Sequence, residues 1–263
     1  MKTAVPRLAE LAQLVEVVHV VGPTAGKPLR TERLPDGSIG LLFRLTEGRA
    51  DSPPSTRAGE LSIAGPRTRA LYNTISDVLF AIYVRFRPGA GGPFLGVSAD
   101  ALTDGAARIE DVWGSDGLEL RDRILAAAGP GEMLEVLQRG LVTRSRRAFD
   151  SPAELLARRA VRMLESGPPS LRIEELAAKL GASTRHLRRT FAAAVGVGPR
   201  EFARSVRLRR ALEAAASESS LAKVAVVAGY YDQAHMNADF RDLLDATPRD
   251  FVRSRRPAVL AKR

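Results

Sequence analysis

Three arginines in the C-terminal half of the chain have the spacing of one helix face. Arg185, Arg188 and Arg189 stand at positions i, i+3 and i+4, which places them side by side on an α-helix. A guanidinium group presents a planar fork of N–H donors that matches phosphate oxygens and the acceptor edge of guanine. These residues therefore favour recognition of a nucleic-acid groove by hydrogen bonding.

The arginines lie within an internal repeat whose two copies are 49 residues apart. In each copy a short apolar segment ends at a glycine, and a turn then leads to a residue that can cap a new helix. These caps are Ser183 and Asp232. The pattern predicts two helix-turn-helix units, at about residues 171–195 and 220–244.

The helix that follows each cap has an apolar residue at every fourth position. The two series are Leu187, Phe191 and Val195, and Met236, Phe240 and Leu244. Such a stripe buries one face and leaves the opposite face free to enter a groove. The alternative is a helical repeat used for protein contacts, but two units are short for a stacked array. We therefore predict that the partner is double-stranded DNA.

The charge distribution agrees with this interpretation. The chain has 40 Lys and Arg against 30 Asp and Glu, a formal net charge of +10. Residues 1–150 contain 19 basic and 18 acidic residues, whereas residues 151–263 contain 21 and 12. An excess confined to one half is typical of contact with a polyanion. A solvated basic surface is the alternative explanation of the charge alone.

The N-terminal half has a different texture. Glycine and proline divide residues 5–97 into short runs with the alternation of strands, and Phe80, Ile82, Val84 and Phe86 fall on one face of the clearest run. From about residue 98 to 147 the pattern is helical. We predict an α+β protein, in which residues 1–150 form a small β-rich domain with helices and residues 151–263 form an all-α double helix-turn-helix domain. The connection is expected at Thr143–Asp150.

Several function classes are excluded or disfavoured. The 263 residues contain no cysteine, so there is no disulfide, thiolate metal site or cysteine nucleophile. His186 and His235 are equivalent positions of the repeat and His19 stands alone, so no metal site is expected. No acidic residues are placed as an acid–base pair, and we predict no catalytic residue, no cofactor and no enzyme activity. Without an apolar run of about 18–20 residues, we expect a cytoplasmic protein that does not enter a membrane.

At the repeat, the sequence resembles the AraC/XylS family of bacterial transcription regulators. The similarity covers about residues 152–256, and the segment Gly229–His235 is similar to the family signature glycine–aromatic–x–Asp–Gln–Ser–His. The resemblance implies two helix-turn-helix subdomains on a connecting helix, from Pro199 to about Ala216, that place two recognition helices in successive major grooves. The residues expected to contact DNA are Ser183, Arg185, His186, Arg188 and Arg189 in the first unit, and Gln233, His235, Asn237 and Arg241 in the second.

The second unit departs from the family pattern. By position, the resemblance implies that its base-reading candidates are Gln233, Ala234, Asn237 and Ala238, and many members have arginine where this chain has Ala238. We therefore predict that the first unit supplies most of the sequence discrimination and that the second mainly positions the protein.

The N-terminal half resembles one AraC-type subgroup in Val84–Gly89, Phe94–Gly96 and Leu102–Asp104. The resemblance suggests a cupin-like β-domain that senses a small-molecule effector or forms a homodimer. We place the dimer surface on the helices between Leu118 and Leu141. RNA polymerase is a further partner if the protein is an activator. No effector-binding residue can be identified.

Two other functions remain open at this point. One is a low-specificity architectural DNA-binding protein whose first half is a protein-interaction module. The other is an enzyme within residues 1–150 fused to a DNA-binding segment.

Overall fold

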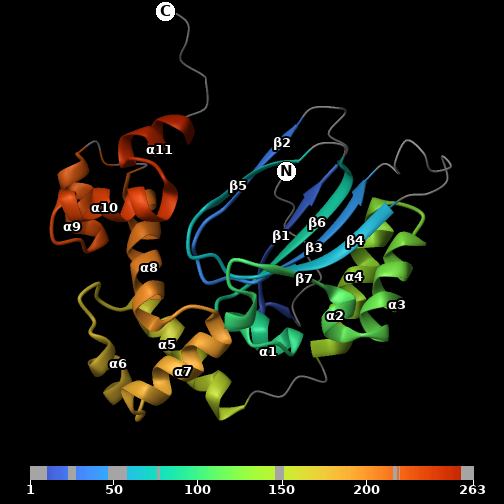
Figure 1. Cartoon of the computed structure of the whole chain (residues 1–263), viewed down its shortest axis with the longest axis horizontal. Coiled ribbons are helices and arrows are strands. Elements are labelled where there is room, and N and C mark those ends of the chain that lie inside the picture. The colour runs from blue at the N-terminus through green and yellow to red at the C-terminus, as the bar shows by residue number, and fades with distance from the viewer. Residues whose placement is uncertain are drawn as a thin grey trace, which may run out of the picture.

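The computed structural model describes residues 11–22, 28–46, 58–75, 78–145, 151–215, 218 and 220–255. Figure 1 shows a twisted β-sheet with helices along one side and a column of helices on the other side. The chain is mixed α+β, with a β-rich first half followed by a helical second half, as the sequence predicts. No helix within the described residues is long and apolar enough to cross a membrane.

The strands of the first half form two antiparallel sheets. The larger sheet has the order β1-β6-β3-β4-β7, and β2 pairs with β5. The strands are β1 (Val15–Val21), β2 (Leu29–Arg33), β3 (Gly40–Thr46), β4 (Ala58–Ala64), β5 (Leu71–Ile75), β6 (Val78–Phe86) and β7 (Ala106–Arg108). The pairing is nested, β2·β5 within β1·β6, which is the pattern of a jelly roll and favours the cupin-like form.

Strand β6 forms because its apolar residues alternate. It lies between β1 and β3, and Phe80, Ile82, Val84 and Phe86 are all buried. The turn signal Pro35–Gly37 is also confirmed, since Gly37 has φ +68°. The other expected turn, at residues 53–55, lies outside the described residues.

Helices of the first half cover one face of the large sheet. They are α1 (Gly91–Leu95), the 3₁₀ helix η2 (Ala99–Leu102), α2 (Ile109–Trp113), α3 (Ser115–Leu125) and α4 (Pro130–Ser145). The expectation of a wholly helical segment from 98 to 147 is wrong at β7, where three residues extend the sheet edge beside β4. Residues 143–145 of the expected connection belong to α4, and residues 146–150 lie outside the described part.

The apolar residues of α3 and α4 are used inside the chain. Ile124, Leu137 and Leu141 are at most 1% exposed and pack in the core against the sheet, whereas Leu118 is 41% exposed. The helical periodicity that suggested a dimer surface is therefore explained by packing on this chain's own sheet. Dimerisation through these helices stays a prediction, but the periodicity of their apolar residues no longer supports it.

The second half consists of helices with two apolar cores. The helices are α5 (Pro152–Ser166), α6 (Ile173–Lys179), α7 (Thr184–Val195), α8 (Pro199–Ala214), α9 (Leu221–Ala228), α10 (Gln233–Leu244) and α11 (Pro248–Arg255). One core gathers α5 to α7 with the start of α8, and the other gathers the end of α8 with α9 to α11. Helix α8 therefore belongs to both (Figure 1).

Candidate nucleic-acid interface

The first helix-turn-helix unit consists of α6 and α7. Gly181 turns the chain with φ +66°, a conformation that glycine adopts without steric cost. The Ser183 hydroxyl accepts a hydrogen bond from the backbone N–H of His186 at 3.2 Å and so caps α7. This confirms the predicted cap and shows that the Ser183 side chain serves the helix start, where N–H groups lack partners within the helix.

Helix α7 separates its buried and exposed faces as the sequence predicts. Leu187, Phe191 and Val195 are fully buried. Four predicted contact residues are exposed on the opposite side: Arg185, His186, Arg188 and Arg189. Arg188 lies 3.8 Å from the Glu174 carboxylate of α6, with both side chains more than half exposed, and such surface pairs are weak. Among the described residues, Arg185 and Arg189 have no acidic partner.

The second unit, α9 and α10, repeats this geometry. Gly229 has φ +86°, and the Asp232 carboxylate accepts a hydrogen bond from the backbone N–H of His235 at 2.7 Å. The predicted contact residues Gln233, His235 and Arg241 are exposed, as are Ala234 and Ala238, whereas Asn237 is half-buried. The His235 ring packs edge-on against Tyr230, with 5.2 Å between ring centroids. The exposed face of α10 therefore carries less positive charge than that of α7.

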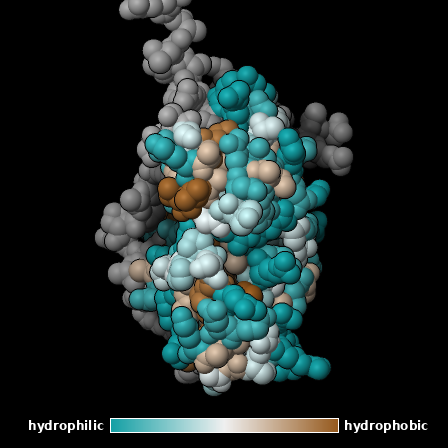
Figure 2. Space-filling model, turned by 90° about the vertical axis from the view of Figure 1, so that its left-hand side faces the viewer, coloured by the Kyte–Doolittle hydropathy of each residue, from teal (hydrophilic) through white to brown (hydrophobic). Residues whose placement is uncertain are grey.

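A groove of about 880 Å³ lies between the two units. Its lining includes Arg188 from α7, Arg200 and Arg207 from α8, and His235 from α10. Cationic side chains of α7 and α8, together with the His235 imidazole of α10, thus face one concave surface, which suits the phosphate backbone of DNA. Figure 2 shows that the side of the molecule where α6 and α9 lie is mostly hydrophilic, with small hydrophobic areas.

Sequence reasoning missed an ion-pair cluster behind α10. Arg204 of α8 donates to the Asp239 carboxylate at 2.6 Å and also bonds Asp242. The Asp239 side chain is only 6% exposed. Hydrogen bonds from Arg204, and next from Arg69, hold the pKa of Asp242 below its usual range. The only available signal was two acidic residues three apart in a helix expected to meet DNA.

Other arginines of α8 are also used within the chain. Arg209 pairs with Glu165 at 2.9 Å, and Arg210 donates to the backbone carbonyls of Glu165 and Gly167 at the end of α5. Part of the basic excess of residues 151–263 therefore fixes α5 on the connecting helix.

The geometry agrees with the comparison with protein families. A model described as a helix-turn-helix domain matches residues 176–254, which span both units. Residues 176–254 therefore form an AraC-type helix-turn-helix domain, which is the DNA-binding domain of a family of transcription regulators. Because that family consists of regulators and not of enzymes, the match supports the prediction of no enzyme activity. Residues 4–108 match a domain of unknown function, DUF6597.

Similar solved structures include other AraC-type proteins. A transcriptional regulator from Chromobacterium violaceum is 23% identical, with 41% of this chain and 99% of that chain covered and a TM-score of 0.38. The DNA-binding domain of AdpA, solved with a target DNA, is 25% identical, with coverages of 41% and 99% and a TM-score of 0.35. ToxT from Vibrio cholerae is 12% identical, with coverages of 91% and 96% and a TM-score of 0.41. No curated protein sequence matches, and the assignment of residues 176–254 rests on the domain model.

Proposed function

We propose that this AraC-type regulator reads two successive major grooves on one face of DNA, with α7 in the first and α10 in the second. The observation that carries the proposal is the pair of capped helices, each with a buried stripe and an exposed polar face. Helix α8 has 16 residues, so it spans about 24 Å. The groove repeat is about 34 Å, so a connecting helix of this length is of the right order to hold the two recognition helices one repeat apart.

The two helices contribute unequally in this proposal. Arg185, Arg188 and Arg189 of α7 supply most of the discrimination, because arginine can bind the guanine edge through two hydrogen bonds. Gln233 and Asn237 of α10 add weaker readout beside the small side chains of Ala234 and Ala238. His186, His235 and Arg241 contact the phosphate backbone, which positions the protein without specifying bases.

The test is selection from a random duplex pool at about 150 mM salt, where non-specific attraction is weakened. We expect two conserved blocks about one helical turn apart, with the higher information content in the block that α7 contacts. A matched selection with Arg189→Ala should lose the preference at one base pair of that block. A pool that stays random while binding persists would contradict the proposal.

The runner-up is a low-specificity architectural DNA-binding protein. It is favoured by one observation, the groove whose concave surface is lined by Arg200 and Arg207 of the connecting helix. Arginines at such a surface can bind phosphate whatever the base sequence. A footprint that covers any duplex equally and disappears with rising salt would support this alternative. A footprint fixed at the selected site would reject it.

For the first half we propose control by a small-molecule effector, in a regulatory domain of residues 1–150 that precedes a DNA-binding domain of residues 151–263. A cavity of about 660 Å³ lies between β1, β2, β5 and β6, within the range of about 300–1,000 Å³ typical of ligand sites. Arg33, Arg44 and Tyr83 line it. Native mass spectrometry of the full chain with a library of small metabolites should detect a complex, and Ala81→Trp, which narrows the cavity, should abolish it.

Two partners and a location complete the proposal. A homodimer should sediment as a species heavier than the 28.4 kDa chain, and a single 28.4 kDa species at micromolar concentration would reject it. Contact with RNA polymerase is expected if the protein activates transcription, and in vitro transcription from the selected site would test this. Because bacterial DNA lies in the cytoplasm, the proposed function implies a cytoplasmic protein.

A further inference from the structure

The C-terminal ends of both recognition helices contact the first half of the chain. Helix α7 ends at Val195 and is followed by Gly196, whose φ is +88°. The Thr103 hydroxyl, which follows η2, donates a hydrogen bond to the Gly196 carbonyl at 2.6 Å. The last carbonyls of a helix have no partner within the helix, so the first half provides a partner just beyond the end of α7.

Helix α10 is held in the same way. The backbone N–H of Ala70 donates to the Leu243 carbonyl at 2.7 Å, and the Tyr72 hydroxyl donates to the Leu244 carbonyl at 3.0 Å. The Arg69 guanidinium also donates to the Asp242 carboxylate in the same last turn. A cation near a helix C-terminus is favourable because the unpaired carbonyls carry partial negative charge.

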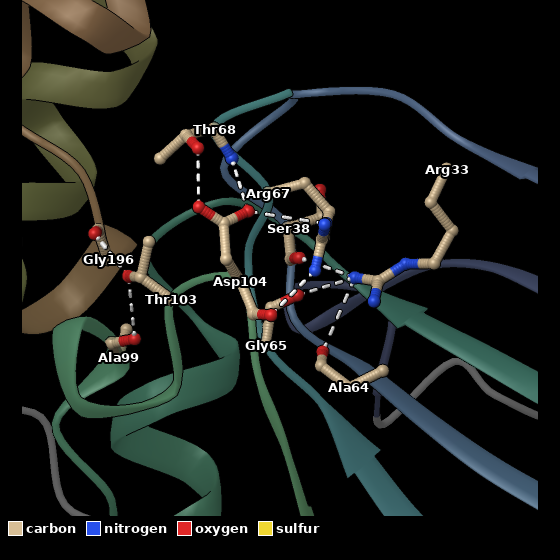
Figure 3. A network of polar contacts seen from close by, with 10 residues as sticks. All are labelled: Arg33, Ser38, Ala64, Gly65, Arg67, Thr68, Ala99, Thr103, Asp104 and Gly196. Atoms are coloured by element: carbon tan, nitrogen blue, oxygen red, sulfur yellow. Dashed lines mark hydrogen bonds and ion pairs between the residues drawn. The ribbon is translucent and has the colours of Figure 1, made fainter. Parts of the chain in front are cut away.

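The residues that hold α7 and those that hold α10 belong to one connected unit. Figure 3 shows the Asp104 carboxylate accepting hydrogen bonds from the backbone N–H and the hydroxyl of Thr68. Arg67 donates to the Asp104 carbonyl at 2.7 Å. The backbone N–H of Asp104 in turn donates to the Pro66 carbonyl at 2.8 Å. We call residues 65–72 together with 103–105 the brace.

The brace is tightly packed against the end of α7 and against Leu102 of the first half. A Cβ added to Gly196 would lie 2.1 Å from Pro66 Cγ, and one added to Gly65 would lie 1.7 Å from the Leu102 carbonyl oxygen. Real Cβ atoms do not approach other heavy atoms this closely, so neither position has room for a side chain. Asp104 has φ +59°, a backbone conformation that aspartate adopts more readily than most residues. The geometry of the brace is therefore closely defined.

We propose that the brace fixes the distance and relative rotation of α7 and α10, so that Thr103, Arg69 and Tyr72 are positioning residues for two-groove binding. The inference rests on the proposed function. Within the described residues α8 also joins the two units, and the brace adds a second connection. Two linked modules gain about 10²–10⁴ in affinity only when their geometry allows simultaneous contact.

The brace does not cover the surface expected to meet DNA. Within the described residues, its hydrogen bonds to the recognition helices go to their C-terminal ends, whereas Arg185, Arg189, Gln233 and His235 lie in the first two turns and are exposed. A contact that blocked DNA binding would cover these residues. The arrangement therefore favours a brace that prepares both helices for binding.

The brace also has a support inside the first half. Arg33 of β2 donates to the Gly65 carbonyl at 2.7 Å (Figure 3), and the same residue lines the cavity between the strands. Removing the Arg33 guanidinium should loosen the brace without touching either recognition helix. Arg33→Gln is therefore expected to have the same effect as a change in the brace itself.

The test compares full-length variants on duplexes that carry the selected site. In the double variant Thr103→Val and Tyr72→Phe, each recognition helix loses one hydrogen bond from the brace. We expect affinity for the two-block site to fall about 10-fold, on the order of one neutral hydrogen bond, while affinity for a single first block stays unchanged. The variant should also discriminate less against a site with one base pair inserted between the blocks.

Thr103→Ser, which keeps the hydroxyl, is the matched control and should bind as the unaltered chain does. Retained single-block binding shows that a variant is folded. Unchanged or tighter binding of the double variant to the two-block site would overturn the proposal, and tighter binding would indicate an inhibitory contact instead.

A second readout does not depend on DNA. Hydrogen exchange of the Gly196 amide, which bonds the Ala192 carbonyl, should be faster in Thr103→Val than in Thr103→Ser. Equal exchange in the two variants would overturn the brace even if the chain binds no specific sequence. If the random-pool selection yields no motif but the two variants differ in exchange as expected, the proposed function is rejected and the brace is retained.

Discussion

The two recognition helices have the same length and the same kind of cap but use their polar residues differently. Helices α7 and α10 each have 12 residues and begin at a side-chain cap. The charged residues of α7 point outward. On α10, Asp239 and Asp242 point back to Arg204 of α8. One repeat therefore presents cations on its exposed face, while the other is anchored to the connecting helix by its acidic residues.

The largest effect expected from this difference is on stability. Arg204→Ala leaves the buried Asp239 carboxylate without its partner, which should lower the free energy of unfolding by about 3 kcal/mol, as for other broken buried pairs. Urea unfolding of the full chain measures this. Arg209→Ala, which removes a half-exposed pair with Glu165, is the control and should cost less than about 1 kcal/mol. Equal losses of unfolding free energy in Arg204→Ala and Arg209→Ala would show that the buried pair stabilises the chain no more than the half-exposed one.

The next effect is on base recognition by α7. Arg189→Ala should weaken binding to the selected site by about 1–3 kcal/mol and relax the preference at one base pair. Arg200→Ala, in the groove between the units, should weaken binding to all sequences equally and reduce the salt slope by about 1. Fluorescence anisotropy titrations over a salt series separate the two. A uniform loss for Arg189→Ala would assign this residue to phosphate.

A smaller effect is expected on the exposed face of α10. Gln233→Ala should cost about 1 kcal/mol or less, the order of one hydrogen bond, and leave the sequence of the first block unchanged. Repeating the random-pool selection with this variant gives the result. Gln233→Ala could instead reduce the base preference in the second block as much as Arg189→Ala reduces it in the first. That result would show that the two helices read bases equally.

The smallest effect concerns pH. Because the pKa of Asp242 is lowered by Arg204 and Arg69, its contribution to stability is complete above the unfolded pKa of about 3.9. It is lost as the pH falls through the lower folded value. Asp242→Asn should therefore be less stable than the unaltered chain at pH 7, with the difference shrinking below about pH 4. Urea unfolding of both proteins at pH 7 and below about pH 4 measures this. An equal difference in the free energy of unfolding under the two conditions would contradict the expectation.

Much of the local structure could be predicted from the sequence. The caps at Ser183 and Asp232 and the stripe ending at Val195 depend on residues close in the chain, so spacing alone identifies them. The strand β6 is equally clear because its alternation is regular. The family model then confirms the helix-turn-helix repeat that these local patterns indicate.

What could not be predicted depends on contacts between distant residues. Thr103 and Gly196 are 93 positions apart, and Arg69 and Asp242 are 173 apart. No local period records such pairs. The segment Leu102–Asp104 stood out only through its resemblance to a subgroup, and the structure now gives Thr103 and Asp104 a place in the brace. The packing of the apolar residues of α3 and α4 on the sheet could not be predicted for the same reason, since periodicity does not say what covers a helix face.

The reading of two adjacent grooves by two unequal helices is tested by the affinity of the full chain for four duplexes. These are the selected site, the site with its first block scrambled, the site with its second block scrambled, and the site with half a helical turn inserted between blocks. We expect the largest loss for the first scrambled block, a smaller loss for the second, and a marked loss for the insertion. Equal affinity for the inserted and intact sites would contradict the two-groove account.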